Sequence, residues 1–326
     1  MALHWKIEFL RLDLKYTWAI SRNATDFKIN AFVTVSDGTH RGIGEAAPNV
    51  RYGESPELFE TVFSNLNLTG FKNLSGLADS IKTVPNSLRF AIESAYVHYL
   101  CAKENKTVAA YFELPEPGIR NTSYTIPIMS IEKLADYFTQ YTPDRFKYIK
   151  LKVNGENMVD LVKEVRRICP NPFMIDANEA YTNPDQFLSD LEKTNETRIE
   201  FVEQPFPAGF SEEYKYLKNN SFNLIFADES ITDHADFETL ASCFDGINVK
   251  LMKAGGYLNG IRLLKEAQKH GLKTMIGCMV ETGLGISSGL HLASLSDYLD
   301  LDSFLILKDD KFPLVTEENG RLFLAN

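Results

Sequence analysis

The feature that most constrains the fold is a regular alternation of short apolar segments and amphipathic helical segments from about residue 123 onward. Repeated βα units favour a parallel sheet, and eight of them favour its closure into a barrel. Strands are predicted at 124–129, 148–153, 173–176, 199–203, 224–227, 246–250, 274–277 and 304–307. Helices are predicted between them at 131–140, 158–168, 184–192, 257–270 and 287–295.

The first third of the chain has a different rhythm. Polar and apolar residues alternate over 3–14, 27–36 and 42–46, which indicates antiparallel strands, and helical spacing follows over 56–66 and 88–101. Proline and glycine then gather at 115–118. We therefore expect an α+β unit over 1–122 and a barrel over 123–309, with strand-rich residues of about 310–326 returning to the first unit.

Composition excludes several classes of protein. The formal net charge is −10 and no basic run is present, which disfavours nucleic-acid binding. No apolar run is long enough to span a membrane, and no secretion signal is visible. The cysteines lie far apart without metal-binding spacing, as expected for reduced thiols. A cytoplasmic location is expected.

Acidic residues follow three successive predicted strands. Asp176, Glu203 and Asp228 are spaced one βα unit apart, so their carboxylates are expected to face a common point at the carboxyl ends of the strands. Three anions at one point repel each other, and a divalent cation would relieve that repulsion. A ligand set that consists of oxygen atoms alone favours Mg²⁺, with Mn²⁺ as a possible substitute.

Lysines occupy two other strand ends. Lys150 and Lys152 are two residues apart on one strand and therefore share a face of the sheet, and Lys250 lies four strands further on. Repulsion between the paired ammonium groups is expected to lower the pKa of at least one of them, as a general base requires. A carboxylate substrate held on the metal would have Lys152 on one face of its α-carbon and Lys250 on the other, with Lys150 stabilising the developing negative charge.

These motifs together resemble the enolase superfamily, in its muconate-lactonising subgroup. The resemblance rests on KLKVN, DAN, EQP, ADES and NVKLMKAGG in the barrel, and on GIGEAAP and RYGES before it. It implies a modified TIM barrel, (β/α)₇β, with an α+β capping domain from the N-terminal part and the C-terminal tail. It also implies Mg²⁺ at Asp176, Glu203 and Asp228, and acid–base catalysis by Lys152 and Lys250.

Within that subgroup the chain looks most like the dipeptide epimerases, in particular L-Ala-D/L-Glu epimerase. Asp300 and Asp302 suit a substrate ammonium group, and Arg22 suits a side-chain carboxylate. Cys278 and Met279, after the seventh strand, are further candidates for substrate contact, whereas the role of Glu281 stays open. The resemblance implies an isomerase acting on small dipeptides in cell-wall peptide metabolism, and a homo-oligomer is possible.

Other reactions on this scaffold stay open. An o-succinylbenzoate synthase-like elimination or a cycloisomerase reaction would use the same metal and Lys152, without a need for Asp300 and Asp302. Epimerisation of dipeptides other than Ala-Glu is also compatible with the residues. A catalytically silent binding barrel would be expected to lack one of these charges, and none is missing.

Overall fold

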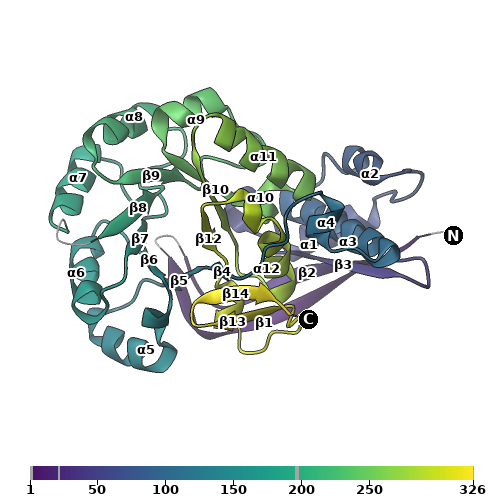
Figure 1. The fold of residues 1–326 in the computed structure, drawn as a ribbon, viewed down its shortest axis with the longest axis horizontal. Coiled ribbons are helices and arrows are strands. Elements are labelled where there is room, and N and C mark those ends of the chain that lie inside the picture. Colours follow the sequence, from purple (N-terminus) through teal and green to yellow (C-terminus); the bar gives the residue numbers. More distant parts are fainter. Residues whose placement is uncertain (1–2, 21–22, 195–197, 326) are drawn as a thin grey trace.

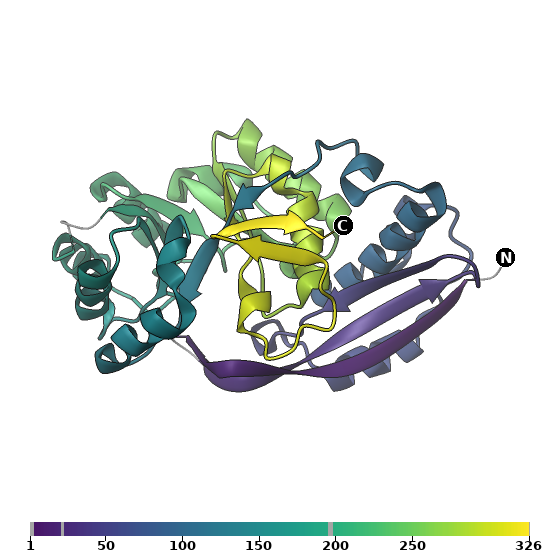
Figure 2. The same ribbon diagram turned by 60° about the horizontal axis from the view of Figure 1, so that its bottom comes forward.

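The chain begins with an antiparallel sheet that carries a long helix. β1 (His4–Ile20), β2 (Asn23–Ser36) and β3 (Arg41–Ala46) pair in that order, and α3 (Asn86–Glu104) packs on β3. Gly42 permits this approach, since a Cβ atom there would lie 2.0 Å from the carbonyl oxygen of Ala95. The computed structural model describes residues 3–20, 23–194 and 198–325 (Figures 1 and 2). The shorter elements of this part are η1 (Val50–Tyr52), α1 (Pro56–Ser64), α2 (Leu74–Ser80) and α4 (Val108–Tyr111).

An eight-stranded sheet forms the centre of the second part of the molecule, with its strands in sequence order and parallel wherever a pairing is described. Helices lie on its outside (Figure 1). The expected modified TIM barrel with a separate N-terminal α+β part is confirmed. The strands are β5 (Ser123–Ile126), β6 (Tyr148–Lys152), β7 (Phe173–Asp176), β8 (Ile199–Glu203), β9 (Leu224–Ala227), β10 (Gly246–Lys250), β11 (Lys273–Gly277) and β12 (Tyr298–Asp300).

Three of the α-helices between these strands, α8, α9 and α10, were not predicted from the sequence. The full set is η2 (Ile131–Lys133), α5 (Leu134–Tyr141), η3 (Pro143–Arg145), α6 (Met158–Ile168), α7 (Pro184–Glu192), α8 (Ser211–Asn220), α9 (Phe237–Cys243), α10 (Leu251–Ala254), α11 (Tyr257–Lys269), α12 (Gly283–His291) and η4 (Ala293–Leu295).

Large side chains fill the barrel on the side away from the strand ends that carry charge. Met174, Phe201, Phe226 and Met275 form one buried cluster, and the rings of Phe201 and Phe226 stack with centroids 4.0 Å apart. This plug is apolar because each of these residues precedes the polar end of its strand and points inward. It leaves the opposite mouth of the barrel free for a polar site.

The prediction of a last barrel strand over residues 304–307 is wrong. Residues 304–307 lie mainly in the short 3₁₀ helix η5 (Ser303–Ile306), and β12 closes the sheet instead by pairing with β11. The apolar residues of η5 face β1, where Ile306 and Leu307 are buried against Leu12 and Leu14. A short apolar run does not reveal whether it packs inside a barrel or beneath another sheet, and this run does the second.

Side chains join the two ends of the barrel sheet. Thr122, just before β5, donates from its hydroxyl to the carbonyl of Leu299 and accepts from the amide of Leu301. The C-terminal hairpin of β13 (Val315–Glu318) and β14 (Arg321–Leu324) pairs with β4 (Arg120–Asn121), the segment that leads into β5. The division into domains at residues 122 and 309 stays a prediction.

Among the described helices, none combines the length and the apolar character needed to cross a membrane.

Candidate active site

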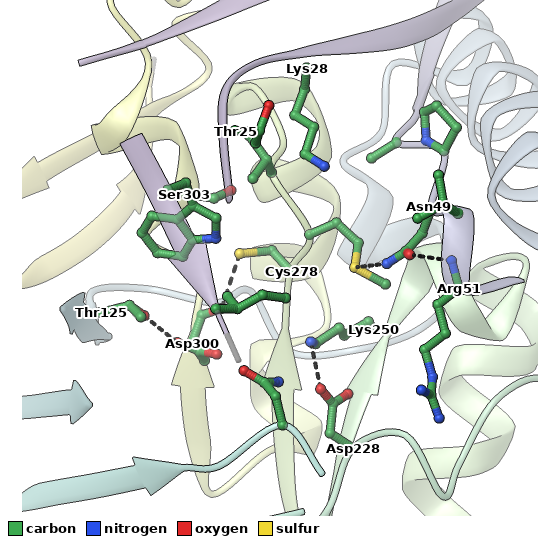
Figure 3. Close-up of a pocket in the computed structure, with 18 of the residues that line it drawn as sticks. Thr25, Lys28, Asn49, Arg51, Thr125, Asp228, Lys250, Cys278, Asp300 and Ser303 are labelled. Atoms are coloured by element: carbon green, nitrogen blue, oxygen red, sulfur yellow. Dashed lines mark hydrogen bonds and ion pairs between the residues drawn. The ribbon is translucent and has the colours of Figure 1, made fainter. Parts of the chain in front are cut away.

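A cavity of about 630 Å³ lies between the charged strand ends of the barrel and the N-terminal sheet. β12, β11 and β10 supply one wall, and β2 with the segment around η1 covers the opening (Figure 3). Charged and amide residues make up much of the lining, together with Tyr52, Glu229 and Cys278. The other charged and amide residues of the lining are Lys28, Asn30, Asn49, Arg51, Lys152, Asn178, Asp228, Lys250, Asp300 and Asp302.

The three predicted metal ligands meet at the floor of this cavity. Parallel register aligns Asp176 with Glu203, and Asp228 directly follows β9. One oxygen from each carboxylate can be chosen so that all three lie within 4.8 Å of one another, and all three residues are buried. The sequence spacing therefore placed these acids correctly.

Neighbouring groups orient the acids. The side chain of Asn248 donates to Oε1 of Glu203 at 2.8 Å, and the backbone amide of Asn178 donates to Oδ1 of Asp176 at 3.0 Å. Burial raises the pKa of Glu203 to about 7, and the charges of Asp176 and Asp228 add to the rise although Lys150 opposes it. This carboxylate repulsion and the all-oxygen donor set fit a hard divalent cation such as Mg²⁺.

Lys150 lies inside the group of acids rather than beside it. Its Nζ is 3.0 Å from Asp176 Oδ2, 2.8 Å from Glu203 Oε2 and 2.7 Å from Asp300 Oδ2. Burial alone would lower the pKa of Lys150, but the surrounding carboxylates outweigh it and hold that pKa well above its ordinary value. The expectation of a pKa depressed by the neighbouring lysine is wrong for Lys150, because carboxylates and not ammonium groups dominate its surroundings.

Lys152 and Lys250 reach the cavity from opposite sides. The Nζ of Lys152, on β6, is 2.5 Å from Asp176 Oδ2, and the Nζ of Lys250, on β10, is 2.8 Å from Asp228 Oδ2. Both residues are buried and both line the cavity. Burial alone would lower the pKa of Lys250. The charge of Asp228 outweighs burial and holds that pKa above its ordinary value. Two ammonium groups therefore flank the space above the acids.

Asp300 and Asp302 lie at the end of β12 and have different surroundings. Asp300 is engaged, since it accepts from Lys150 and its Oδ1 accepts from the Ser123 hydroxyl at 2.7 Å. Asp302 accepts from the backbone amide of Thr125 at 2.5 Å. Burial, with the charge of Asp300, raises the pKa of Asp302 to about 7. Both carboxylates line the cavity, and Asp302 is the one without a lysine partner among the described residues.

The remaining predicted site residues differ in what the structure says of them. Cys278 and Met279 line the cavity, and the thiol of Cys278 donates to the carbonyl of Asp300 at 3.2 Å. Glu281 is buried behind them and accepts from the amide of Met279 at 2.7 Å, so it supports this wall. Burial, with the charge of Glu45, raises the pKa of Glu281 to about 8. Arg22 lies outside the described residues.

Two further cations near the site, Lys253 and Arg51, form contacts that were not predicted. Lys253, one turn after Lys250, places its Nζ 2.5 Å from Asp228 Oδ1. Its spacing of three from Lys250 was a usable signal. Arg51, from η1, forms a two-pronged ion pair with Glu179 beyond β7, with a shortest distance of 2.5 Å. That pair joins residues 128 apart in sequence, so nothing local indicated it.

Comparisons with known proteins agree with this architecture. A family model described as enolase C-terminal domain-like matches residues 131–318. A protein named L-Ala-D/L-amino acid epimerase from Pedosphaera parvula is 33% identical, over 98% of this chain and 96% of its own length. One of the same name from Flavobacterium johnsoniae is 30% identical, over 97% of this chain and 95% of its own.

A solved structure supports the same assignment. The dipeptide epimerase of Methylococcus capsulatus, complexed with Mg and the dipeptide L-Arg-D-Lys, is 26% identical to this chain. It superposes with a TM-score of 0.87 and covers 100% of this chain and 98% of its own. The barrel carries charged residues at its strand ends and is covered by the N-terminal sheet, and the matches agree with this architecture. The chain belongs to the enolase superfamily.

Proposed function

We propose that this protein is a dipeptide epimerase, an isomerase that inverts the α-carbon of the C-terminal residue of a dipeptide such as L-Ala-L-Glu. The observation that carries the proposal is the position of two buried lysines, Lys152 and Lys250, on opposite sides of the Asp176, Glu203 and Asp228 group. Inversion requires a proton to leave one face of the α-carbon and another to arrive at the opposite face.

The carboxylate of the dipeptide would bind to a cation held by the three acids of the metal site, and its ammonium group would lie toward Asp302. A bound Mg²⁺ would hold the substrate carboxylate and make the neighbouring α-proton more acidic. For one stereoisomer Lys152, in its neutral form, removes the α-proton while protonated Lys250 supplies one from the other face. For the opposite stereoisomer the two lysines would exchange roles. Lys250 would then act in its neutral form, and a cation held by Asp228 would offset the negative charge that raises the pKa of Lys250. Lys150, fixed by three carboxylates, presents positive charge toward the reacting end.

Which dipeptide is preferred is a finer part of the proposal. The names of the two curated relatives support alanine as the first residue. Glutamate as the second residue is our proposal from the family resemblance. Mn²⁺ as a substitute metal, a homo-oligomeric state and a setting in cytoplasmic cell-wall peptide metabolism are proposed on the same basis.

The test is exchange of the α-proton in D₂O, followed by mass spectrometry and chiral analysis of L-Ala-L-Glu and a small dipeptide library. We expect deuterium to enter the C-terminal residue as D- and L-forms equilibrate. Absence of exchange across the library would overturn the proposal. Turnover of an amine-free acid by elimination or cyclisation, with no dipeptide exchange, would favour the other reactions known to be compatible with this scaffold.

A further inference from the structure

Lys28 is a cation at the cavity with no anion assigned to it. It lies on β2, in the sheet that covers the barrel, and Figure 3 shows its ammonium end directed into the space above Cys278. The residue is half-buried. Within the described part of the chain, no carboxylate lies within ion-pair distance of its Nζ. Burial lowers the pKa of Lys28, so its charge costs solvation that no partner offsets.

The other cations that line the cavity in the described part of the chain are paired. Each has a carboxylate oxygen at 2.5–2.8 Å, in the pairs Arg51 with Glu179, Lys152 with Asp176, and Lys250 with Asp228. These cations are therefore committed to the protein's own anions. Among the described residues that line the cavity, Lys28 is the cation that a ligand anion could pair with. Nearby polar side chains are engaged, since the Thr25 hydroxyl donates to the carbonyl of Phe27 at 2.6 Å and Asn49 contacts Met279.

The position of Lys28 relative to the other anchors limits what it can contact. A cation held by the acids at the floor would take the carboxylate of a bound dipeptide, and Asp302, which lies beside β5, would take its ammonium group. Lys28 lies on the covering side, at the opposite side of the cavity from Asp228 and Asp300 (Figure 3). The remaining substituent of the reacting carbon is the side chain of the second residue, and it is the group left to extend toward β2.

We propose that Lys28 is a specificity-determining residue that pairs with a side-chain carboxylate on the second residue of the dipeptide, so that acidic dipeptides are preferred over neutral ones. This inference rests on the proposed epimerase function. An ammonium group gains most from an anion where water is partly excluded, because the attraction is screened less than at an open surface. A hydrophobic or cationic second residue would leave the Lys28 charge unmatched.

The experiment compares L-Ala-L-Glu with L-Ala-L-Gln, which have nearly the same shape and differ in charge. For the wild type we expect kcat/KM to favour the glutamate substrate. In Lys28→Met the ratio of the two kcat/KM values should fall roughly 10- to 100-fold, the loss expected for one hydrogen bond to a charged group. The fall should come mainly from KM, since the contact is remote from the proton in transfer.

Two further variants make the result specific. Lys28→Arg should restore most of the glutamate preference, and Lys28→Glu should move the preference toward L-Ala-L-Lys. Lys6→Met, on the exposed face of β1, is the matched control and should leave the ratio unchanged. Circular dichroism and the unfolding midpoint show whether each variant is folded.

The outcomes separate the two claims. A glutamate-to-glutamine ratio that is the same in the wild type and in folded Lys28→Met overturns the role of Lys28 and leaves the epimerase proposal standing. A wild type that prefers glutamine or lysine in the second position does the same. Absence of exchange with every dipeptide removes the epimerase proposal, and the specificity inference with it.

Discussion

The Nζ of Lys250 lies 2.8 Å from Oδ2 of Asp228, one of the three carboxylates that fit a metal ion. On the other side of the site Lys152 has the same relationship to Asp176, at 2.5 Å. Each lysine is thus held at the edge of the acidic group by one of its members. This arrangement keeps both ammonium groups close to where a substrate carboxylate would bind, and it explains how two lysines can serve one carbon.

Removal of either lysine should stop inversion. For Lys152→Ala and for Lys250→Ala we expect epimerisation to fall by roughly 100- to 10,000-fold, the usual contribution of a positioned acid or base. A variant that keeps one working base should still exchange the α-proton of one stereoisomer in D₂O. Lys163→Ala, exposed on α6, is the control. Normal epimerisation by either active-site variant would disprove the two-base assignment.

Metal removal should abolish activity and also lower stability. We expect a chelator to stop exchange and added Mg²⁺ to restore it, with Mn²⁺ as a weaker or equal substitute. Mg²⁺ at about 100 times its Kd should stabilise the fold by about 2.7 kcal/mol, which is measurable as a raised unfolding midpoint. Glu203→Gln should remove that shift, whereas Asp79→Asn, exposed on α2, should keep it. A Mg²⁺ shift that persists in Glu203→Gln would place the metal elsewhere.

Loss of the Asp302 charge should weaken binding of the substrate amine. In Asp302→Asn we expect kcat/KM for L-Ala-L-Glu to fall by roughly 10- to 100-fold, mostly through KM, because a hydrogen bond to a charged group is lost. N-acetyl-L-Ala-L-Glu, which has no ammonium group, should be a poor substrate of the wild type and should lose little in the variant. Equal losses on both substrates would indicate that Asp302 acts through the fold instead.

Glu93 should make stability depend on pH far from the site. It is buried on α3, and its Oε1 accepts from the amide of Leu258 at 3.0 Å. Burial raises the pKa of Glu93 to about 7, against the opposing backbone hydrogen bonds. The folded state therefore binds more protons than the unfolded state between about pH 4.5 and 7, so this group costs stability as pH rises through that window, by about 3 kcal/mol in all.

The check is urea unfolding of the wild type and Glu93→Gln at pH 5 and pH 8. The free energy of unfolding of the variant, relative to that of the wild type, should rise between the two pH values by up to about 3 kcal/mol. Glu60→Gln, exposed on α1, should show no such change. A constant difference between Glu93→Gln and the wild type would contradict a raised pKa at Glu93.

The sequence by itself determined the barrel and the acidic triad. A strand-like apolar segment recurs once per βα unit. Because a parallel barrel brings the carboxyl ends of all its strands to one rim, Asp176, Glu203 and Asp228 were expected to meet there. Lys152 and Lys250 followed from the same rule, with four strands between them. Local periodicity failed at residues 304–307, because an apolar run has the same composition whether it packs in a barrel or under β1.

Only the tertiary structure decided which charges pair with which. Lys150 contacts Asp300, which is 150 residues away, and because of this contact we propose Asp302 as the acid that binds a substrate amine. Lys28 reaches the cavity because β2 crosses the barrel mouth, although nothing in its local sequence marks it as a site residue. Charge pairing acts over a few ångströms in space and is independent of distance along the chain, so it becomes visible only once the fold has brought the partners together.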